Sequence, residues 1–527
     1  MILRVVLVVG LIMVAQVANA QSLAEQSAEI LRTSCGACHP SKSNIWDANS
    51  LASARAVGDS ILEQLAADTM PPKNLPKLSE AEKKVIADWL NTPVGPLPPQ
   101  GSTLTNDGSS TPQQKPRQFL GDAWVRSKIA ADTQQQGDTL YLSLANLYNA
   151  GFSKQELWNA QGAVSKAVNL LSASAQIVVP AKVDPNGIVL RFNLGELGRG
   201  EEFAAELLKV YPYAELDKGY LRGDWFVSRG LSAPLYYRLT GIPATQRDLD
   251  ALLDIDRQRF INNNIVQRAG ISTSKVAFRN RIVELAPSRT GSARLTYDTQ
   301  DEERDRRVLT NPLGPIDNQN RFSARAFRHD AVEYIYDLPN GLHGYAAFNG
   351  QGQRQDKVPE NIASDPNQYS GTTSIVPGIS CVSCHKVGTQ VAVSDEVLQG
   401  APLFSVAEAA KVGELYAPKD QFVAALERDG ANFLAASAKA TEPFRSIPEP
   451  IGPLALEYNK PLNLAAVSRE SNANDADVRS AIAADATLQT QGLGPLLDGQ
   501  TITRATFESV EAGTSPAQRI GQLVGRR

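Results

Sequence analysis

Side chains that commonly bind metals are scarce in this chain of 527 residues, which has four cysteines, four histidines and three methionines. Charge of one sign is not in excess either, because 52 basic and 56 acidic residues give a formal net charge of −4. Such a balance provides no overall attraction for a nucleic acid, which excludes nucleic-acid binding as a general function. With 42% hydrophobic and 20% charged residues, the composition is that of a globular protein and disfavours disorder or a membrane-embedded body.

Long hydrophobic runs are absent beyond the N-terminus. Residues 1–20 contain one basic residue, Arg4, then an apolar stretch from Val5 to Val14, and end in Ala18-Asn19-Ala20. This order is typical of a secretory signal peptide, with an uncleaved anchor as the alternative. The apolar stretch is shorter than the ~20 residues that span a bilayer. We therefore expect an exported protein, most simply in a bacterial periplasm, with no transmembrane segment after the signal is removed.

The few cysteines occur in two copies of the pattern C-x-x-C-H, which is typical of c-type haem attachment. The copies are Cys35-Gly36-Ala37-Cys38-His39 and Cys381-Val382-Ser383-Cys384-His385. On a helical turn, thiols at positions i and i+3 point the same way and can bond two vinyl groups of one porphyrin. The adjacent histidine then binds the iron. We therefore expect two haem c groups, with Cys35, Cys38, Cys381 and Cys384 as attachment residues and His39 and His385 as iron ligands.

Disulfides and zinc are the alternatives for four cysteines in an exported chain. Four histidines in a chain of this length would follow both cysteine pairs by chance with a probability on the order of 10⁻⁵ to 10⁻⁴. The pairs also lie 346 residues apart, far from the close pairing of a zinc ribbon. Haem attachment is the better interpretation of both copies.

The region 21–92 resembles the class I cytochrome c domain. An amphipathic stretch precedes the first motif, Thr69-Met70-Pro71-Pro72 follows it, and Ser79-Glu80-Ala81-Glu82 forms a capping box that predicts a final helix. The resemblance implies an all-α fold in which Met70, between the attachment helix and the last helix, is the second ligand of the first iron. A methionine opposite a histidine favours ferrous iron and a relatively high potential.

A linker rich in Pro, Ser, Thr and Gly is expected at 93–117, before an α+β domain at 118–391. Helical periodicity covers 139–150 and 154–171, and Ser153 with Glu156 forms a capping box at the start of the second stretch. Strands are expected at 176–179 and 188–194, around the turn residues 184–187.

A second hairpin is expected from strands at 332–336 and 343–348, around the turn Leu338-Pro339-Asn340-Gly341. The region 137–385, with Asn146-Leu147-Tyr148-Asn149-Ala150-Gly151 among its phrases, resembles an uncharacterised domain of secreted multidomain haem proteins. This resemblance implies a shared fold and no particular chemistry.

The second iron lacks a methionine downstream, which leaves His329 and His343 as its possible second ligands. Either histidine can give a bis-histidine electron carrier, or stand away from the iron as a proton-transfer group over an open site. In the domains that this region resembles, a histidine occupies the position of His329, which favours His329 as the ligand. An ordinary surface or core histidine is the alternative for both residues.

The region 392–527 is rich in alanine and is expected to be mainly helical, with Pro418 at a helix start and Phe422, Leu426 and Phe433 turned inward. The expected fold class is therefore a multidomain chain. It has an all-α cytochrome c domain, then an α+β domain with a second haem-attachment site, and a mainly helical C-terminal region.

The expected function is periplasmic electron transfer through two covalent haems to an unidentified redox partner protein. The alternative is an oxidoreductase of the dihaem peroxidase or oxygenase type, in which the second haem is catalytic. The spin state of the second haem discriminates between the two, because an open coordination site favours high-spin iron.

Overall fold

The computed structural model divides the chain into two compact units, Met1–Pro116 and Arg117–Arg527. It describes residues 77–91, 118–134, 138–214, 216–271, 276–317, 319–389, 393–510 and 514–524, together with Ser27, Ile30, Leu31, Ser34, Cys35, Ile61, Leu62, Gln64 and Leu65. The boundary between the units falls at the end of the expected linker. The signal peptide expected at 1–20 lies outside the described residues.

In the first unit, the described residues include helix α5 (Glu80–Asn91). The predicted capping box is confirmed, because the Ser79 backbone N–H donates to the Glu82 carboxylate at 2.8 Å and the Glu82 N–H donates to the Ser79 hydroxyl at 3.3 Å. Ile86 of α5 is fully buried and belongs to a small cluster with Leu31, Ile61, Leu65 and Leu78. The first unit therefore has an apolar cluster of its own.

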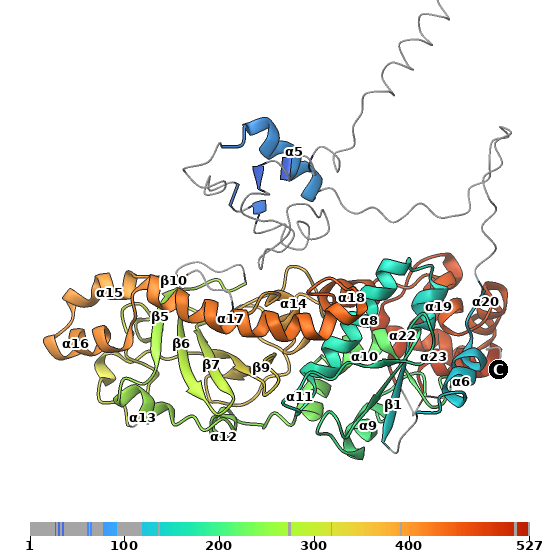
Figure 1. Cartoon of the computed structure of the whole chain (residues 1–527), viewed down its shortest axis with the longest axis horizontal. Coiled ribbons are helices and arrows are strands. Elements are labelled where there is room, and N and C mark those ends of the chain that lie inside the picture. Colours follow the sequence, from blue (N-terminus) through green and yellow to red (C-terminus); the bar gives the residue numbers. More distant parts are fainter. Residues whose placement is uncertain are drawn as a thin grey trace, which may run out of the picture. The chain divides into compact units, whose positions relative to one another are not determined.

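The second unit is built on a six-stranded antiparallel sheet in the order β10-β5-β6-β7-β8-β9 (Figure 1). Its strands are β5 (Gln267–Ile271), β6 (Arg281–Ser288), β7 (Gly291–Asp298), β8 (Ala331–Asp337), β9 (His343–Asn349) and β10 (Val393–Ser394). The pairing of β7, β8 and β9 places Thr296, Glu333 and Ala347 in one cross-strand row. Side chains alternate along each strand, so Tyr297, Val332 and Phe348 lie on the opposite face.

A smaller sheet has the order β2-β3-β1-β4, in which only β1 and β4 are parallel. Its strands are β1 (Thr139–Ser143), β2 (Ala181–Lys182), β3 (Val189–Asn193) and β4 (Leu221–Arg222). The predicted capping box on helix α8 (Lys154–Leu170) is confirmed, with Ser153 and Glu156 bonded reciprocally. Almost all of α8 beyond its first turn is buried, so this helix is a core element of the second unit.

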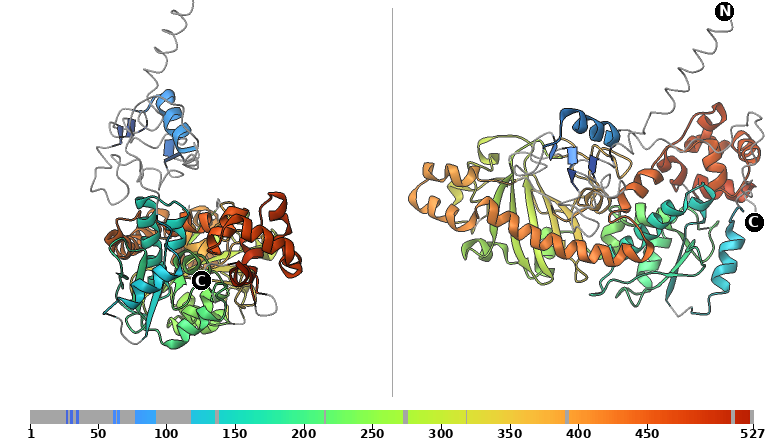
Figure 2. Two further views of the ribbon diagram at one scale, coloured as in Figure 1. Left: turned by 90° about the vertical axis from the view of Figure 1, so that its right-hand side faces the viewer. Right: turned by 45° about the horizontal axis from the view of Figure 1, so that its top comes forward.

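Helix α17 (Lys419–Thr441) crosses the larger sheet and continues to α8 (Figure 2). Its Phe422 and Leu426 pack against Ala269 and Val283 of the sheet. The predicted start at Pro418 and the predicted inward residues of this helix are confirmed. Because Val283 shares a face with Glu333, α17 covers the face of the sheet that carries Glu333.

Other helices surround the two sheets. They are α6 (Asp122–Ala130), α7 (Ala145–Asn149), α9 (Glu201–Leu208), α10 (Gly223–Gly230), α11 (Leu235–Thr240), α12 (Gln246–Leu252), α13 (Arg257–Asn262), α14 (Ile379–Cys384), α15 (Glu396–Gly400), α16 (Val406–Leu415), α18 (Ile451–Tyr458), α19 (Leu464–Glu470), α20 (Asp475–Ala484), α21 (Ala486–Leu488), α22 (Arg504–Glu508) and α23 (Pro516–Val524).

The expected fold class is wrong. The described residues form a mixed α/β structure with two sheets, rather than an all-α domain followed by an α+β domain and a separate helical region. The C-terminal residues do not form a region of their own, because β10 pairs with β5 and α17 packs on the same sheet. The helical character of 392–527 reflects helices that cover the sheets of the second unit.

Candidate haem-attachment site

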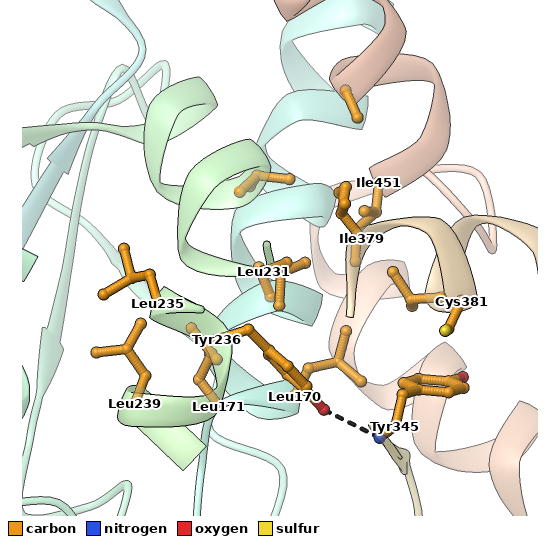
Figure 3. Packing of buried hydrophobic residues seen from close by; sticks show 14 of the residues in the cluster. Leu170, Leu171, Leu231, Leu235, Tyr236, Leu239, Tyr345, Ile379, Cys381 and Ile451 are labelled. Atoms are coloured by element: carbon orange, nitrogen blue, oxygen red, sulfur yellow. Dashed lines mark hydrogen bonds between the residues drawn. The ribbon is translucent and has the colours of Figure 1, made fainter. Parts of the chain in front are cut away.

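Helix α14 carries the second C-x-x-C-H motif. It begins after Gly378, which has a φ of +89°, and a Cβ at this position would lie 2.0 Å from the carbonyl oxygen of Leu231. Only glycine fits there, so this residue fixes where the helix starts. Ile379 and Cys381 project from α14 into the apolar core, and Tyr345 of β9 lies beside Cys381 (Figure 3).

The two thiols of the motif are not joined in a disulfide. Burial raises the pKa of Cys381 well above its usual value. Desolvation and the carboxylates of Asp365 and Glu333 raise the pKa of Cys384 to about 12. Zinc binding and dithiol redox chemistry use thiolates, which form where cations stabilise them. The surroundings of this pair are acidic instead, which disfavours both alternatives.

His385 directly follows α14 and is held through both ring nitrogens. Its Nδ1 lies 3.3 Å from the carbonyl oxygen of Gly388, and its Nε2 lies 3.1 Å from Oε1 of Glu333. The ring also stacks on Tyr345, with centroids 6.1 Å apart and planes at 27°. A histidine ligand typically donates one N–H to a carbonyl and uses the other nitrogen for the metal. By this pattern, Nε2 is the nitrogen of His385 suited to iron.

Glu333 was not predicted as a functional residue. Its Oε2 accepts a hydrogen bond from Arg281 at 3.0 Å, and Arg281 also pairs with Asp298 at 2.6 Å. Burial would raise the pKa of Glu333, but the hydrogen bond from His385 and the charge of Arg281 lower it to about 2. The side chain is therefore a carboxylate that faces Nε2 of His385. Its signal in the sequence is an acidic residue in the middle of an otherwise apolar stretch of β8.

His343 lies close to His385. A Cβ on Gly388 would lie 3.7 Å from Cε1 of His343, so Gly388 is a neighbour of both histidines. The His343 ring is 1% exposed and stacks on Phe433 of α17, with centroids 4.4 Å apart. Its Nε2 lies 3.4 Å from Asp337, and its Nδ1 has no hydrogen-bond partner among the described residues.

The structure does not bring His329, the favoured ligand, to His385. The His329 ring packs against Tyr297 and Phe327, with centroids 5.3 and 6.3 Å away. Tyr297 lies on the face of the sheet opposite to Glu333, and His385 contacts the Glu333 face. Burial and the charge of Arg257 lower the pKa of His329 to about 4, as expected for a neutral core histidine.

Arg294 on β7 is a second residue that was not predicted. Its side chain is fully buried, and Nη1 donates to Asp337 and to the Ser292 hydroxyl, both at 2.6 Å. The other edge of the guanidinium, Nε with Nη2, has no hydrogen-bond partner among the described residues. This edge has the geometry that binds a carboxylate through two hydrogen bonds. Arg294 and His343 both contact Asp337.

Further polar atoms that have no hydrogen-bond partner among the described residues lie near the second motif. Besides those of His343 and Arg294, they are the hydroxyl oxygens of Tyr345, Ser383 and Thr389. Each such atom costs about 1–3 kcal/mol when it is buried without a hydrogen bond. The attachment thiols, two neighbouring histidines and these unsatisfied groups fit a haem, which brings an iron and carboxylates.

Of the residues expected at the first site, only Cys35 lies within the described residues. Its backbone N–H donates to the carbonyl oxygen of Leu31 at 2.9 Å, as in a helical turn. Cys38, His39 and Met70 lie outside the described residues.

Among the described residues, no three or more His, Cys, Asp or Glu side chains form a cluster able to hold a metal ion. No helix in the described part of the chain has the length and apolar character needed to cross a membrane. Comparison of the chain with protein-family models, with curated proteins and with solved structures finds no match.

Proposed function

We propose that this protein is a secreted c-type cytochrome that carries two covalent haems and transfers electrons in a periplasm. The observation that carries the proposal is that His385 and His343 both lie next to Gly388. His385 directly follows the thiols of Cys381 and Cys384, which are at positions i and i+3 of α14. The two C-x-x-C-H motifs and the N-terminal leader support the same function from the sequence alone.

At the second site, Cys381 and Cys384 would hold the porphyrin and His385 would bind the iron through Nε2. His343, rather than His329, is the second ligand that the packing favours, because only His343 lies near Gly388. A bound haem supplies one-electron chemistry, and two histidine ligands give an electron carrier of low potential. Stacking on Phe433 restricts the orientation of the His343 ring.

The unpaired edge of Arg294 is suited to a haem propionate. A buried guanidinium without a carboxylate on that edge leaves two donors unsatisfied, and a propionate satisfies both. Arg294 would therefore position the haem rather than take part in electron transfer.

At the first site, Cys35 and Cys38 would attach the haem, with His39 and Met70 as the iron ligands. The different ligand pairs would give the two haems different potentials, with the methionine-ligated one higher. Because electrons move toward the higher potential, this difference would give electron transfer between the two haems a direction, and a redox partner protein would supply or accept the electrons.

A catalytic second haem is the second candidate function. The observation that favours it is Glu333, a carboxylate held by Arg281 at the nitrogen of His385 that would bind iron. Because its pKa is about 2, this group stays ionised and would stabilise positive charge that develops near an open iron site. In that case the second haem would lack a second protein ligand.

Counting covalent haem in the purified, exported protein tests the main proposal. We expect two equivalents by pyridine haemochrome after denaturation. The Cys381→Ser/Cys384→Ser variant and the Cys35→Ser/Cys38→Ser variant should each retain one. A colourless protein, or a variant that still holds two equivalents, would contradict the proposal.

The ligands of the second haem are tested by EPR on His343→Ala, with His329→Ala as the matched control. We expect His343→Ala to convert one of two low-spin signals to a high-spin signal and His329→Ala to leave both unchanged. The opposite pattern would restore His329 as the ligand. A high-spin second haem in the unaltered protein would instead favour the catalytic function.

A further inference from the structure

A cavity of about 340 Å³ lies in the second unit, and no residue of the second motif lines it. It forms where the start of α6, residues 216–222 and the end of α19 meet, with Gly521 of α23 at its edge. Its volume lies in the range of pockets that hold small molecules, about 300–1,000 Å³. Its walls combine apolar side chains such as Leu120 and Val125 with charged ones.

Arg222 forms a rigid part of the cavity wall. Its Nε donates to Asp217 at 2.7 Å, and its guanidinium lies 3.7 Å from the centroid of the Tyr213 ring. Only 7% of Arg222 is exposed. Its Nη1 is 3.5 Å from a carboxylate oxygen of Glu470 but has no hydrogen-bond partner among the described residues. A buried donor of a charged group therefore remains available at the cavity.

Three further lining residues also have a buried polar atom without a hydrogen-bond partner in the described part of the chain. These atoms are the hydroxyl of Ser471, Oδ1 of Asn146 and Oδ1 of Asp122. Ser471 is fully buried, and Asn146 is held by a 2.6 Å hydrogen bond to Asp224. The wall therefore offers acceptors as well as donors, and a ligand that uses both must itself carry acceptors and donors.

The charges of the cavity favour an anion. Four basic and three acidic residues line it. The carboxylate of Asp217 already binds Tyr211, Tyr220 and Arg222. That of Glu470 binds Tyr213 and Arg504.

The third acidic residue of the wall, Asp122, pairs with Arg126 at 2.7 Å, which leaves two cations at the rim. Lys218 and Arg469 are exposed there and have no ion pair among the described residues. An anionic ligand can bind them without first breaking an existing pair.

We propose that this cavity binds a small hydroxycarboxylic acid. Its carboxylate would be oriented toward Arg222, Lys218 and Arg469, and its hydroxyl toward Asn146 and Asp122. The apolar part of the wall would cover the short carbon chain. The proposal does not depend on haem at either motif, because the cavity and the motifs share no residues.

Isothermal titration of the full-length protein with malate and tartrate tests this site, and succinate serves as the probe that lacks a hydroxyl. We expect saturable binding of malate or tartrate and at least about tenfold weaker binding of succinate, since the acceptors of the wall would lose their donor. The Lys218→Gln/Arg469→Gln variant should bind the hydroxy acid at least about tenfold more weakly.

The matched control is Arg428→Gln/Lys439→Gln on α17, which removes the same charge from exposed positions outside the cavity. It should bind like the unaltered protein. The absence of saturable binding of both hydroxy acids would overturn the proposal, as would equal affinities in the rim variant and the control. Binding of succinate as strong as that of malate would overturn the assigned role of the hydroxyl.

Discussion

Asp224 is a buried carboxyl group in the first turn of α10, next to the cavity wall. Its Oδ2 accepts a hydrogen bond from Asn146, and its Oδ1 accepts one from the backbone N–H of Trp225 at 2.9 Å. Burial and the nearby carboxylate of Glu470 raise the pKa of Asp224 to about 6, from 3.8 for the free group. The folded protein therefore binds a proton here over a pH range in which the unfolded chain has released it.

This shift predicts how Asp224 contributes to stability. The contribution is fully present below pH 3.8 and is lost as the pH rises through about 6. A difference of about two pKa units corresponds to about 2–3 kcal/mol. Asp224→Asn should therefore become more stable relative to the unaltered protein by about that amount between pH 4 and pH 7, as measured by urea denaturation.

The control for this prediction is Asp498→Asn at an exposed position. Its stability relative to the unaltered protein should stay nearly constant over the same pH range. A constant difference for Asp224→Asn as well would show that Asp224 ionises normally in the folded protein.

The proposed attachment residues are a prediction from the sequence, because the spacing of the C-x-x-C-H motif is local and specific. The choice between His329 and His343 could not be predicted from the sequence. It depends on which face of the β7–β8–β9 sheet each histidine contacts. His329 packs on Tyr297, and Tyr297 lies on the face opposite to Glu333 and His385. Arg294 was missed because its importance comes from an unpaired guanidinium edge, which only the three-dimensional contacts reveal.

At the scale of elements, segments with specific end signals could be predicted. The capping box at Ser153 and the start of α17 at Pro418 are confirmed, as is the hairpin of β8 and β9. The expected helix at 139–150 is wrong in its first half, which is strand β1 and only then α7. Burial of Tyr141, Leu142, Ser143 and Leu144 in a row fits a strand buried on both faces, and periodicity does not separate this from a helix.

The first strand expected before the turn at 184–187 is also wrong, because residues 176–179 are not a strand and the short β2 follows them. The second expected strand is confirmed as β3. The pairing of β2 is limited to Ala181 and Lys182 opposite Arg191 and Leu190. A two-residue strand carries too little pattern for its position to be read from sequence.

The turn between β8 and β9 holds His343 in place and depends on Gly341. This residue has a φ of +87°, and a Cβ on it would lie 3.2 Å from the Cβ of Ala436 in α17. Gly341→Ala should therefore destabilise the protein by about 1–3 kcal/mol, through backbone strain and the close contact with α17. Chemical denaturation measures the loss.

Gly413→Ala in α16 is the matched control, because Gly413 has no strained φ and no atom within 4 Å of the added Cβ. There the same change should stabilise the helix by up to about 1 kcal/mol. Equal effects at the two positions would mean that the hairpin turn does not require glycine.

At the scale of the whole molecule, segments that are far apart in sequence share one core. Lys166 of α8 is fully buried and forms an ion pair with Glu449, and Arg504 of α22 pairs with Glu470. The composition of 392–527 correctly predicted helices. It did not predict that these helices cover the sheets of the second unit, because that depends on contacts between segments that are distant in sequence. For the same reason, residues 392–527 were expected to form a separate region.

The division of the chain after Pro116 predicts that the second unit folds without the first. Each unit has its own apolar cluster, so deletion of residues 21–116 should leave the second unit folded. With residues 1–20 kept, the shortened protein should unfold within about 2 °C of the corresponding transition in the full chain, because less than about 1 kcal/mol would be lost. It should also retain one covalent haem if the proposed attachment at Cys381 and Cys384 is correct. A transition lowered by more than about 5 °C would mean that residues 21–116 contribute to the core of the second unit, and the two proposed haem sites would then be thermodynamically coupled through the fold.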